Sequence, residues 1–255
     1  MRRFVLAILL AALPGALPAQ EEHAQPSVYR ELAEAKTPDD VWEASLQSLV
    51  TQSRNGFIAD PNLGRAEDLC PGAMDAIFEA VTPIIRRGHF LQRDEYRDGM
   101  TEIFAREFTP DQAAEALEFY RSDLGHEMLL FGADANSYTH RVQEVLDSED
   151  EPAPVLDRET FDADLAGTQS AIHRGIDPKI AFEANRILRR SSWYSTYARK
   201  VHPQIQDLRY SIAARDSRFS AAGGGQESAR ATTRALEQHF AQCEAAQALM
   251  AAKAR

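Results

Sequence analysis

Apolar residues recur at intervals of three and four along most of this chain, and this spacing limits its fold more than any other feature. The clearest stretch begins at Thr109-Pro110, where the threonine can cap a helix, proline fits the first turn and Gln112 can close a capping box. One apolar stripe follows, formed by Ala113, Leu117, Tyr120, Leu124 and Met128. We find no long period-two alternation that would predict a strand. The sequence therefore predicts an all-α protein, a bundle of about eight helices.

The same stretch carries a family resemblance. Phe108-Thr109-Pro110 is followed by Phe119-Tyr120-Arg121-Ser122 and, three residues later, by Gly125. This order and spacing resemble the signature of the family catalogued as domain of unknown function 2059, small helical proteins of the bacterial periplasm. The resemblance covers roughly Tyr96 to Tyr138, although such proteins usually have Lys or Gln where this chain has His126-Glu127. It implies an all-helical envelope protein and supplies no catalytic residues.

The first nineteen residues have the pattern of a secretory signal peptide. Met1-Arg2-Arg3 supplies a charged start, an apolar run follows, and Ala19 provides a small residue for cleavage. No cysteine lies near this point, so we expect no lipid anchor. Nor does another segment approach the roughly 20 apolar residues that a membrane span needs. The sequence thus predicts a periplasmic protein, exported by a cleaved signal peptide, with no transmembrane segment in the mature chain.

Net charge limits the partners of the mature chain. Cleavage would remove Arg2 and Arg3 and leave 26 basic against 39 acidic residues, a net charge of −13. A chain this acidic is a poor general binder of nucleic acid or of anionic membranes. We therefore expect no nucleic-acid partner.

The chain has two cysteines, Cys70 and Cys243. Two alternatives are open: separate buried thiols, or a disulfide that closes a loop of more than 170 residues. An oxidising compartment and the even number favour the disulfide.

Composition divides the chain into four segments. These are the signal peptide (1–19), an N-terminal helical domain with the signature (20–146), an acidic, proline-bearing linker (147–158) and a C-terminal helical domain (159–255). Matches at an offset of 68, such as Pro110 with Pro178 and Arg121 with Arg189, suggest two degenerate helical halves, with chance similarity as the alternative.

Three local interpretations concern helix boundaries in the first domain. We expect residues 20–36 to be a loose N-terminus, since they are polar. Asn55-Gly56 should end the helix that starts near Pro38. Gly88 should end the helix that starts near Pro71, and Pro83 should kink that helix.

We find no set of residues typical of an enzyme. The histidines are scattered singly, and His126-Glu127 lacks the second histidine of a zinc-protease helix, so neither a metal nor another cofactor is expected. A helix-capping role for Ser122 and a core position for Tyr120 are favoured over catalytic roles. The alternative is a hydrolase-like site assembled from Ser122, Tyr120 and His126.

The residues from Arg174 to Arg218 form the most suggestive functional feature. Ten basic and four acidic residues occur here in an otherwise acidic chain, with aromatic residues among them. One interpretation is a binding surface for an envelope protein, an anionic surface polymer or a lipid headgroup, formed by Arg186, Arg189, Arg190, Trp193, Arg199 and Lys200. The other is a solvated basic helix face. The function predicted is a non-catalytic binding or envelope-assembly module.

Overall fold

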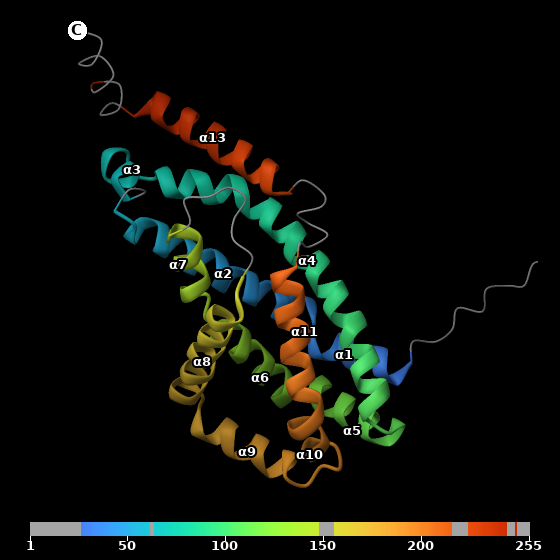
Figure 1. Ribbon diagram of the computed structural model, residues 1–255. Coiled ribbons are helices and arrows are strands. Elements are labelled where there is room, and N and C mark those ends of the chain that lie inside the picture. The colour runs from blue at the N-terminus through green and yellow to red at the C-terminus, as the bar shows by residue number, and fades with distance from the viewer. Residues whose placement is uncertain (1–26, 62–63, 148–155, 216–223, 244–247, 249–255) are drawn as a thin grey trace, which may run out of the picture.

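A computed structural model describes residues 27–61, 64–147, 156–215, 224–243 and 248. Its described elements are all helical, which confirms the predicted fold class (Figure 1). They are α1 (Val28–Lys36), α2 (Asp39–Ala59), α3 (Gly64–Leu69), α4 (Ala73–Glu107), α5 (Pro110–Arg121), α6 (Asp123–Asp134), α7 (Thr139–Asp147), α8 (Arg158–Gly175), α9 (Pro178–Leu188), α10 (Tyr194–Thr196), the π-helix η1 (Tyr197–Val201), α11 (His202–Ala214) and α13 (Gly224–Gln242).

Helix α4 is the longest element, and its length corrects one predicted boundary. It continues through Pro83 and through Gly88, which the sequence predicted to be its end. Helices α1, α2, α11 and α13 all pack against α4, and Gly88 is buried among them. Tertiary packing of this kind outweighs the roughly 1 kcal/mol that an interior glycine costs a helix.

Two other predicted boundaries are also wrong. Residues 28–36 form α1, whose N-cap Ser27 accepts a hydrogen bond from the Arg30 amide and whose Leu32 is buried in the core. Helix α2 continues past Gly56 to Ala59. A Cβ on Gly56 would lie 2.6 Å from Cγ1 of Val142, so this glycine permits the close packing of α7 and is not a helix end.

The main hydrophobic core surrounds Trp193, which is 1% exposed. It includes Leu32 of α1, Phe104 of α4, Phe119 of α5 and Ile205 of α11. One core thus contains residues from both predicted domains. The division into two domains stays a prediction, and most of the predicted linker lies outside the described residues.

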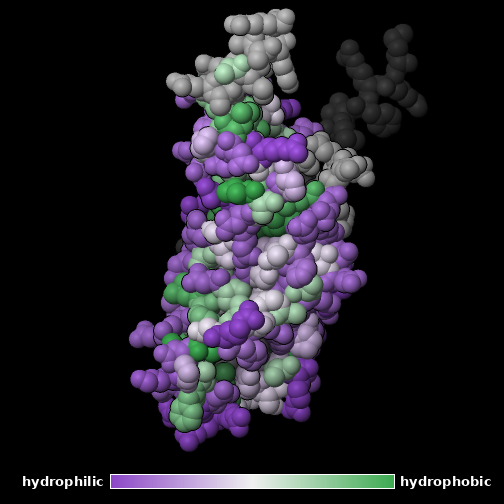
Figure 2. Space-filling view, turned by 90° about the vertical axis from the view of Figure 1, so that its left-hand side faces the viewer, coloured by the Kyte–Doolittle hydropathy of each residue, from purple (hydrophilic) through white to green (hydrophobic). Residues whose placement is uncertain are grey.

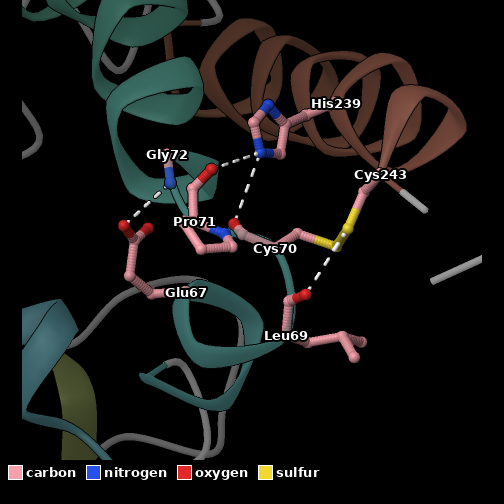
Figure 3. The surroundings of a disulfide bond; sticks show 7 residues. All are labelled: Glu67, Leu69, Cys70, Pro71, Gly72, His239 and Cys243. Atoms are coloured by element: carbon pink, nitrogen blue, oxygen red, sulfur yellow. Dashed lines mark hydrogen bonds between the residues drawn. A yellow bond between two sulfur atoms is a disulfide. The ribbon is translucent and has the colours of Figure 1, made fainter. Parts of the chain in front are cut away.

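A second hydrophobic cluster lies at the other end of α4, where α13 packs along it (Figure 1). Cys243, just beyond α13, forms a disulfide with Cys70, and their Cα atoms are 5.8 Å apart. The predicted pairing is thereby confirmed. Figure 3 shows Nε2 of His239 beside the carbonyl oxygens of Cys70 and Pro71, at 3.3 and 3.2 Å.

The start of α4 is capped beside this disulfide. Glu67 accepts hydrogen bonds from the amides of Gly72, at 2.8 Å, and Met74, at 2.9 Å (Figure 3). These two bonds lower the pKa of the Glu67 carboxyl. Gly72 has a φ of 89°, a left-handed conformation that favours glycine. The chain thus turns sharply from Cys70 into α4.

Two observations describe the surface. Among the described helices, none is both long and apolar enough to cross a membrane. Figure 2 looks onto the side that carries α7 and α8 in Figure 1, and there apolar patches lie scattered among hydrophilic residues.

Candidate functional site

A cavity of about 540 Å³ lies between α2, α4, α6, α8 and α11. Its volume falls within the range of roughly 300–1,000 Å³ that is common for small-molecule sites. Large apolar side chains make up much of its wall, among them Leu49, Met128, Leu129, Leu165 and Ile172. The amphipathic helices that surround it therefore turn part of their apolar faces toward a space large enough for a ligand.

Lys36, the last residue of α1, contributes a cation to this wall. Its Nζ donates a hydrogen bond to the hydroxyl of Tyr120 at 3.3 Å. The same atom lies 4.6 Å from the ring centroid of Tyr120 and 5.1 Å from that of Tyr197. Burial opposes the charge, but the surrounding tyrosines favour it, and on balance the pKa of Lys36 is raised. The hydrogen bond to Tyr120 and the two ring contacts are the interactions that favour the ammonium form of Lys36.

Helix α11 places Arg209 and His202, two turns apart, on the same wall. Burial lowers the pKa of His202, and the charges of Lys36 and Arg209 lower it further. Burial raises the pKa of Tyr96, and Arg209 and Lys36 partly offset that increase. All four side chains line the cavity, and both Lys36 and Arg209 are close enough to Tyr96 and His202 to shift their pKa values.

Neither cation at this end has a carboxylate partner within 4 Å among the residues that the structure describes. Elsewhere such pairs are common, as between Arg97 and Asp39 at 3.3 Å or Arg215 and Glu95 at 2.8 Å. Within the described chain, both cations therefore line the cavity without a carboxylate partner, and the Lys36 ammonium lies against the hydroxyl and the ring of Tyr120.

Asp164 is the acidic residue of the cavity wall, and the N-terminus of α7 already binds it. Its carboxylate accepts hydrogen bonds from the amides of His140, at 2.9 Å, and Arg141, at 3.1 Å. A helix N-terminus carries partial positive charge and stabilises such a carboxylate. Arg141 adds a third cation to the wall. The cavity is thus positive inside an acidic protein.

Trp42 and His89 form a further part of the wall. The Trp42 indole N–H donates to the carbonyl of His89 at 2.9 Å, His89 Nε2 lies 3.2 Å from the Trp42 carbonyl, and their rings stack. Burial lowers the pKa of His89 to about 4. The histidine is therefore neutral at neutral pH.

The signature residues have structural roles outside the cavity lining, as the capping and core interpretations predicted. Thr109 and Gln112 form a capping box with Pro110 in the first turn. Ser122 ends α5 and caps α6, where its hydroxyl accepts from the Gly125 amide at 3.1 Å. A Cβ on Gly125 would lie 2.0 Å from the carbonyl oxygen of Phe119, so only glycine fits this bend.

The aromatic residues of the signature pack around Trp193. Its ring centroid lies 6.4 Å from that of Phe108, 5.7 Å from that of Phe119 and 5.8 Å from that of Tyr120. Trp193 was predicted to contribute to a binding surface, but its burial in this cluster prevents contact with a partner. This part of the prediction is wrong.

The five basic residues predicted to bind a partner are all exposed. Arg186 pairs with Glu183 at 2.8 Å, Arg199 donates to Ser195, and Lys200 lies 3.9 Å from Glu107. Arg189 and Arg190 follow directly after α9. Their binding role stays a prediction.

The three residues of the alternative hydrolase site have different partners. Ser122 donates to the carbonyl of Phe119 at 2.7 Å, Tyr120 binds Lys36, and His126 Nε2 lies 2.8 Å from Oδ2 of Asp40. No hydrogen bond joins the three side chains to one another, so they form no nucleophile and base pair. Within the described ranges we also find no cluster of three or more His, Cys, Asp or Glu residues suited to a metal ion.

Comparison with known proteins identifies the signature and nothing beyond it. The model of a family described as an uncharacterized protein conserved in bacteria (DUF2059) matches residues 94–130, from the C-terminal half of α4 into α6. This match confirms the resemblance inferred from the sequence. No curated protein and no solved structure matches the chain.

Proposed function

We propose that this chain is an exported, non-catalytic binding protein that holds an apolar small molecule in the cavity between α2, α4, α6, α8 and α11. The observation that carries the proposal is a cavity of about 540 Å³ with a largely apolar wall. Binding there would remove apolar ligand surface from water, at roughly 25 cal/mol per Å² of area buried. Localisation in the periplasm is part of the proposal and is supported by the signal-like first nineteen residues.

Gly132 offers a direct way to test occupancy of the cavity. It lines the cavity from α6, and a Cβ placed on it would meet no atom within 4 Å. Replacing Gly132 with leucine would place a side chain in the cavity and reduce the space left for a ligand. The helix should tolerate this change, since leucine is a better helix former than glycine.

The experiment is a fluorescence titration with the neutral apolar probe N-phenyl-1-naphthylamine. We expect saturable binding to wild type and to Gly132→Ala, which adds one methyl group, and at least tenfold weaker binding to Gly132→Leu. Circular dichroism should show the same helix content in all three proteins. The proposal fails if wild type gives no saturable signal, or if Gly132→Leu binds as tightly as Gly132→Ala.

A second candidate is docking of α9 on an anionic lipid surface. Phe182 is 72% exposed and Ile187 is 37% exposed on this helix, beside the exposed Arg186. Exposed aromatic and basic residues on one short helix are typical of interfacial helices. The two candidates are compatible, since α9 is not part of the cavity wall.

A further inference from the structure

We infer that the ligand is an amphipathic anion, an alkyl chain with a carboxylate head, and that the head lies between Lys36 and Arg209. This inference rests on the proposed function and specifies its ligand class. The apolar wall accounts for the chain, and the two cations account for the head.

Lys36 and Arg209 are positioned for this role by two different helices. Lys36 ends α1, and Arg209 lies in α11. Both line the cavity, and neither has a carboxylate of the described chain within 4 Å. An ionised group next to apolar surface is costly without a counter-charge. A ligand carboxylate would supply that charge, and hydrogen bonds between ionised groups are stronger than those between neutral groups.

Gln206 adds an unused hydrogen-bonding group at the same place. It lies one turn of α11 from both His202 and Arg209, and its Oε1 is buried with no hydrogen-bond partner in the described structure. Its Nε2 lies 3.5 Å from Nε2 of His202. Rotation of the amide would exchange its oxygen and nitrogen and let Gln206 donate to an oxygen of the head.

The charge of the cavity is opposite to that of the whole chain, which has a formal net charge of −11. Asp164 is one carboxylate against the three wall cations Lys36, Arg141 and Arg209, and the amides at the start of α7 already bind it. General attraction of anions to the protein therefore cannot explain a preference for an anionic ligand. A measured preference would have to arise inside the cavity.

The volume accommodates a head and a single chain. One water molecule takes up about 30 Å³ in the liquid, and a methylene group is of similar size. A twelve-carbon chain therefore occupies about 360 Å³. That volume fits within the cavity of about 540 Å³. Dodecanoate is therefore a suitable probe, and 1-dodecanol is its neutral counterpart of equal length.

The experiment measures displacement of N-phenyl-1-naphthylamine by dodecanoate and by 1-dodecanol at pH 7.5, below the concentrations at which either aggregates. Wild type should bind dodecanoate at least tenfold more tightly than 1-dodecanol. Lys36→Met and Arg209→Gln should each reduce dodecanoate affinity at least fivefold and leave 1-dodecanol affinity unchanged. Arg230→Gln removes an equal charge from an exposed position on α13, outside the cavity, and should leave both affinities unchanged.

The outcomes separate the inference from the proposed function. If wild type binds neither compound and no neutral probe, the proposed function fails. If wild type binds both compounds equally, the cavity takes apolar ligands and the inference about the head is overturned. The same conclusion follows if Arg230→Gln loses as much dodecanoate affinity as the two cavity variants. Because the wild-type ratio needs no substitution, the inference stays testable even if a variant fails to fold.

Discussion

At the scale of single residues, two glycines of α6 differ in whether their surroundings leave space for a side chain. Gly125 lies against the end of α5, where an added Cβ would be 2.0 Å from the carbonyl oxygen of Phe119. Gly132 faces the cavity, where an added Cβ would meet no atom within 4 Å. The first glycine is therefore required by packing, whereas the second leaves open space in the cavity.

Alanine substitutions at these two positions should have opposite effects. Gly125→Ala should lower the free energy of unfolding by about 1–3 kcal/mol, because the methyl group forces α5 and α6 apart. Gly132→Ala should raise it by about 0.5–1 kcal/mol through helix propensity. Urea unfolding followed by circular dichroism measures both values. Equal changes in the two variants would refute the assigned role of Gly125.

His89 should make stability depend on pH. Its pKa is about 4 in the folded protein against an ordinary value of 6.5, so the unfolded chain binds a proton first as the pH falls. Stability should therefore fall between pH 6.5 and 4, by up to about 3 kcal/mol. His89→Phe keeps a ring to stack on Trp42 and should lack this part of the pH dependence. Parallel pH profiles of the two proteins would contradict the assignment.

Sequence reasoning found the signature residues but missed the residues of the cavity. Caps and bends are local, so Thr109 and Ser122 could be assigned from their neighbours in the sequence. Lys36 was placed in a loose segment, although Ser27 before Val28 was a usable signal for a helix start. Its place on the same cavity wall as Arg209 depends on the packing of α1 and α11 against α4, which no local pattern encodes.

At the scale of elements, α13 is held in two ways. It packs along α4 through the apolar side chains Leu236 and Phe240, and the disulfide joins its C-terminal end to the start of α4. The disulfide spans 173 residues of sequence. It therefore restricts the unfolded chain strongly, and α13 should depend on it.

Loss of the disulfide should destabilise the protein measurably. On the chain-entropy model a loop of this length corresponds to about 5 kcal/mol in the free energy of unfolding. Urea unfolding with and without reducing agent measures the effect, and limited proteolysis should show earlier cleavage within α13. The Cys70→Ala/Cys243→Ala double variant is the control, because reducing agent should not change its midpoint. An unchanged wild-type midpoint after full reduction would contradict a stabilising role.

Sedimentation with lipid vesicles tests whether the exposed face of α9 docks on lipid. We expect wild type to sediment with phosphatidylglycerol vesicles and not with phosphatidylcholine vesicles, with binding reduced by salt. Arg189→Glu/Arg190→Glu should lose this binding. Arg230→Glu/Arg234→Glu changes the same charge on α13, at the opposite end of the molecule (Figure 1), and should retain it. Equal binding by both variants would exclude α9 as the docking element.

The boundaries of elements were harder to predict than their existence. Gly56 and Gly88 both look like helix ends in the sequence, yet both lie inside helices. Gly56 is needed for contact with Val142, and Gly88 is buried where several helices pack on α4. Glycine has the same local signal whether it ends a helix or admits a neighbour, so the sequence alone could not separate the two roles.

At the scale of the whole molecule, the signature and the cavity are formed by different residues. Phe119 and Tyr120 of the signature pack around Trp193, while Ser122 and Gly125 form the bend between α5 and α6. That bend sets the course of α6, which forms one wall of the cavity. Tyr120 links the two regions, because its hydroxyl accepts the hydrogen bond from Lys36. The signature residues thus position α6 and Lys36 beside the cavity without lining it.

The fold class followed from helical periodicity, which is a local property, and the structure confirms it. The cavity arises only when five helices are placed together, so composition and spacing could not reveal it. Nor could the sequence show which basic residues line the cavity. The cluster of charge from Arg174 to Arg218 was visible in the sequence, but only the structure separates Arg209, which lines the cavity, from the exposed Arg199.

The most direct test of the account is to locate a bound ligand in solution. Nuclear Overhauser effects between dodecanoate and protein labelled at the methyl groups of methionine and isoleucine report contacts within about 5 Å. We predict cross-peaks from the alkyl chain to Met128, Ile172 and Ile212, all of the cavity wall, and their loss in Gly132→Leu. Binding without these cross-peaks, or no binding at all, would contradict the assignment of this cavity as the functional site.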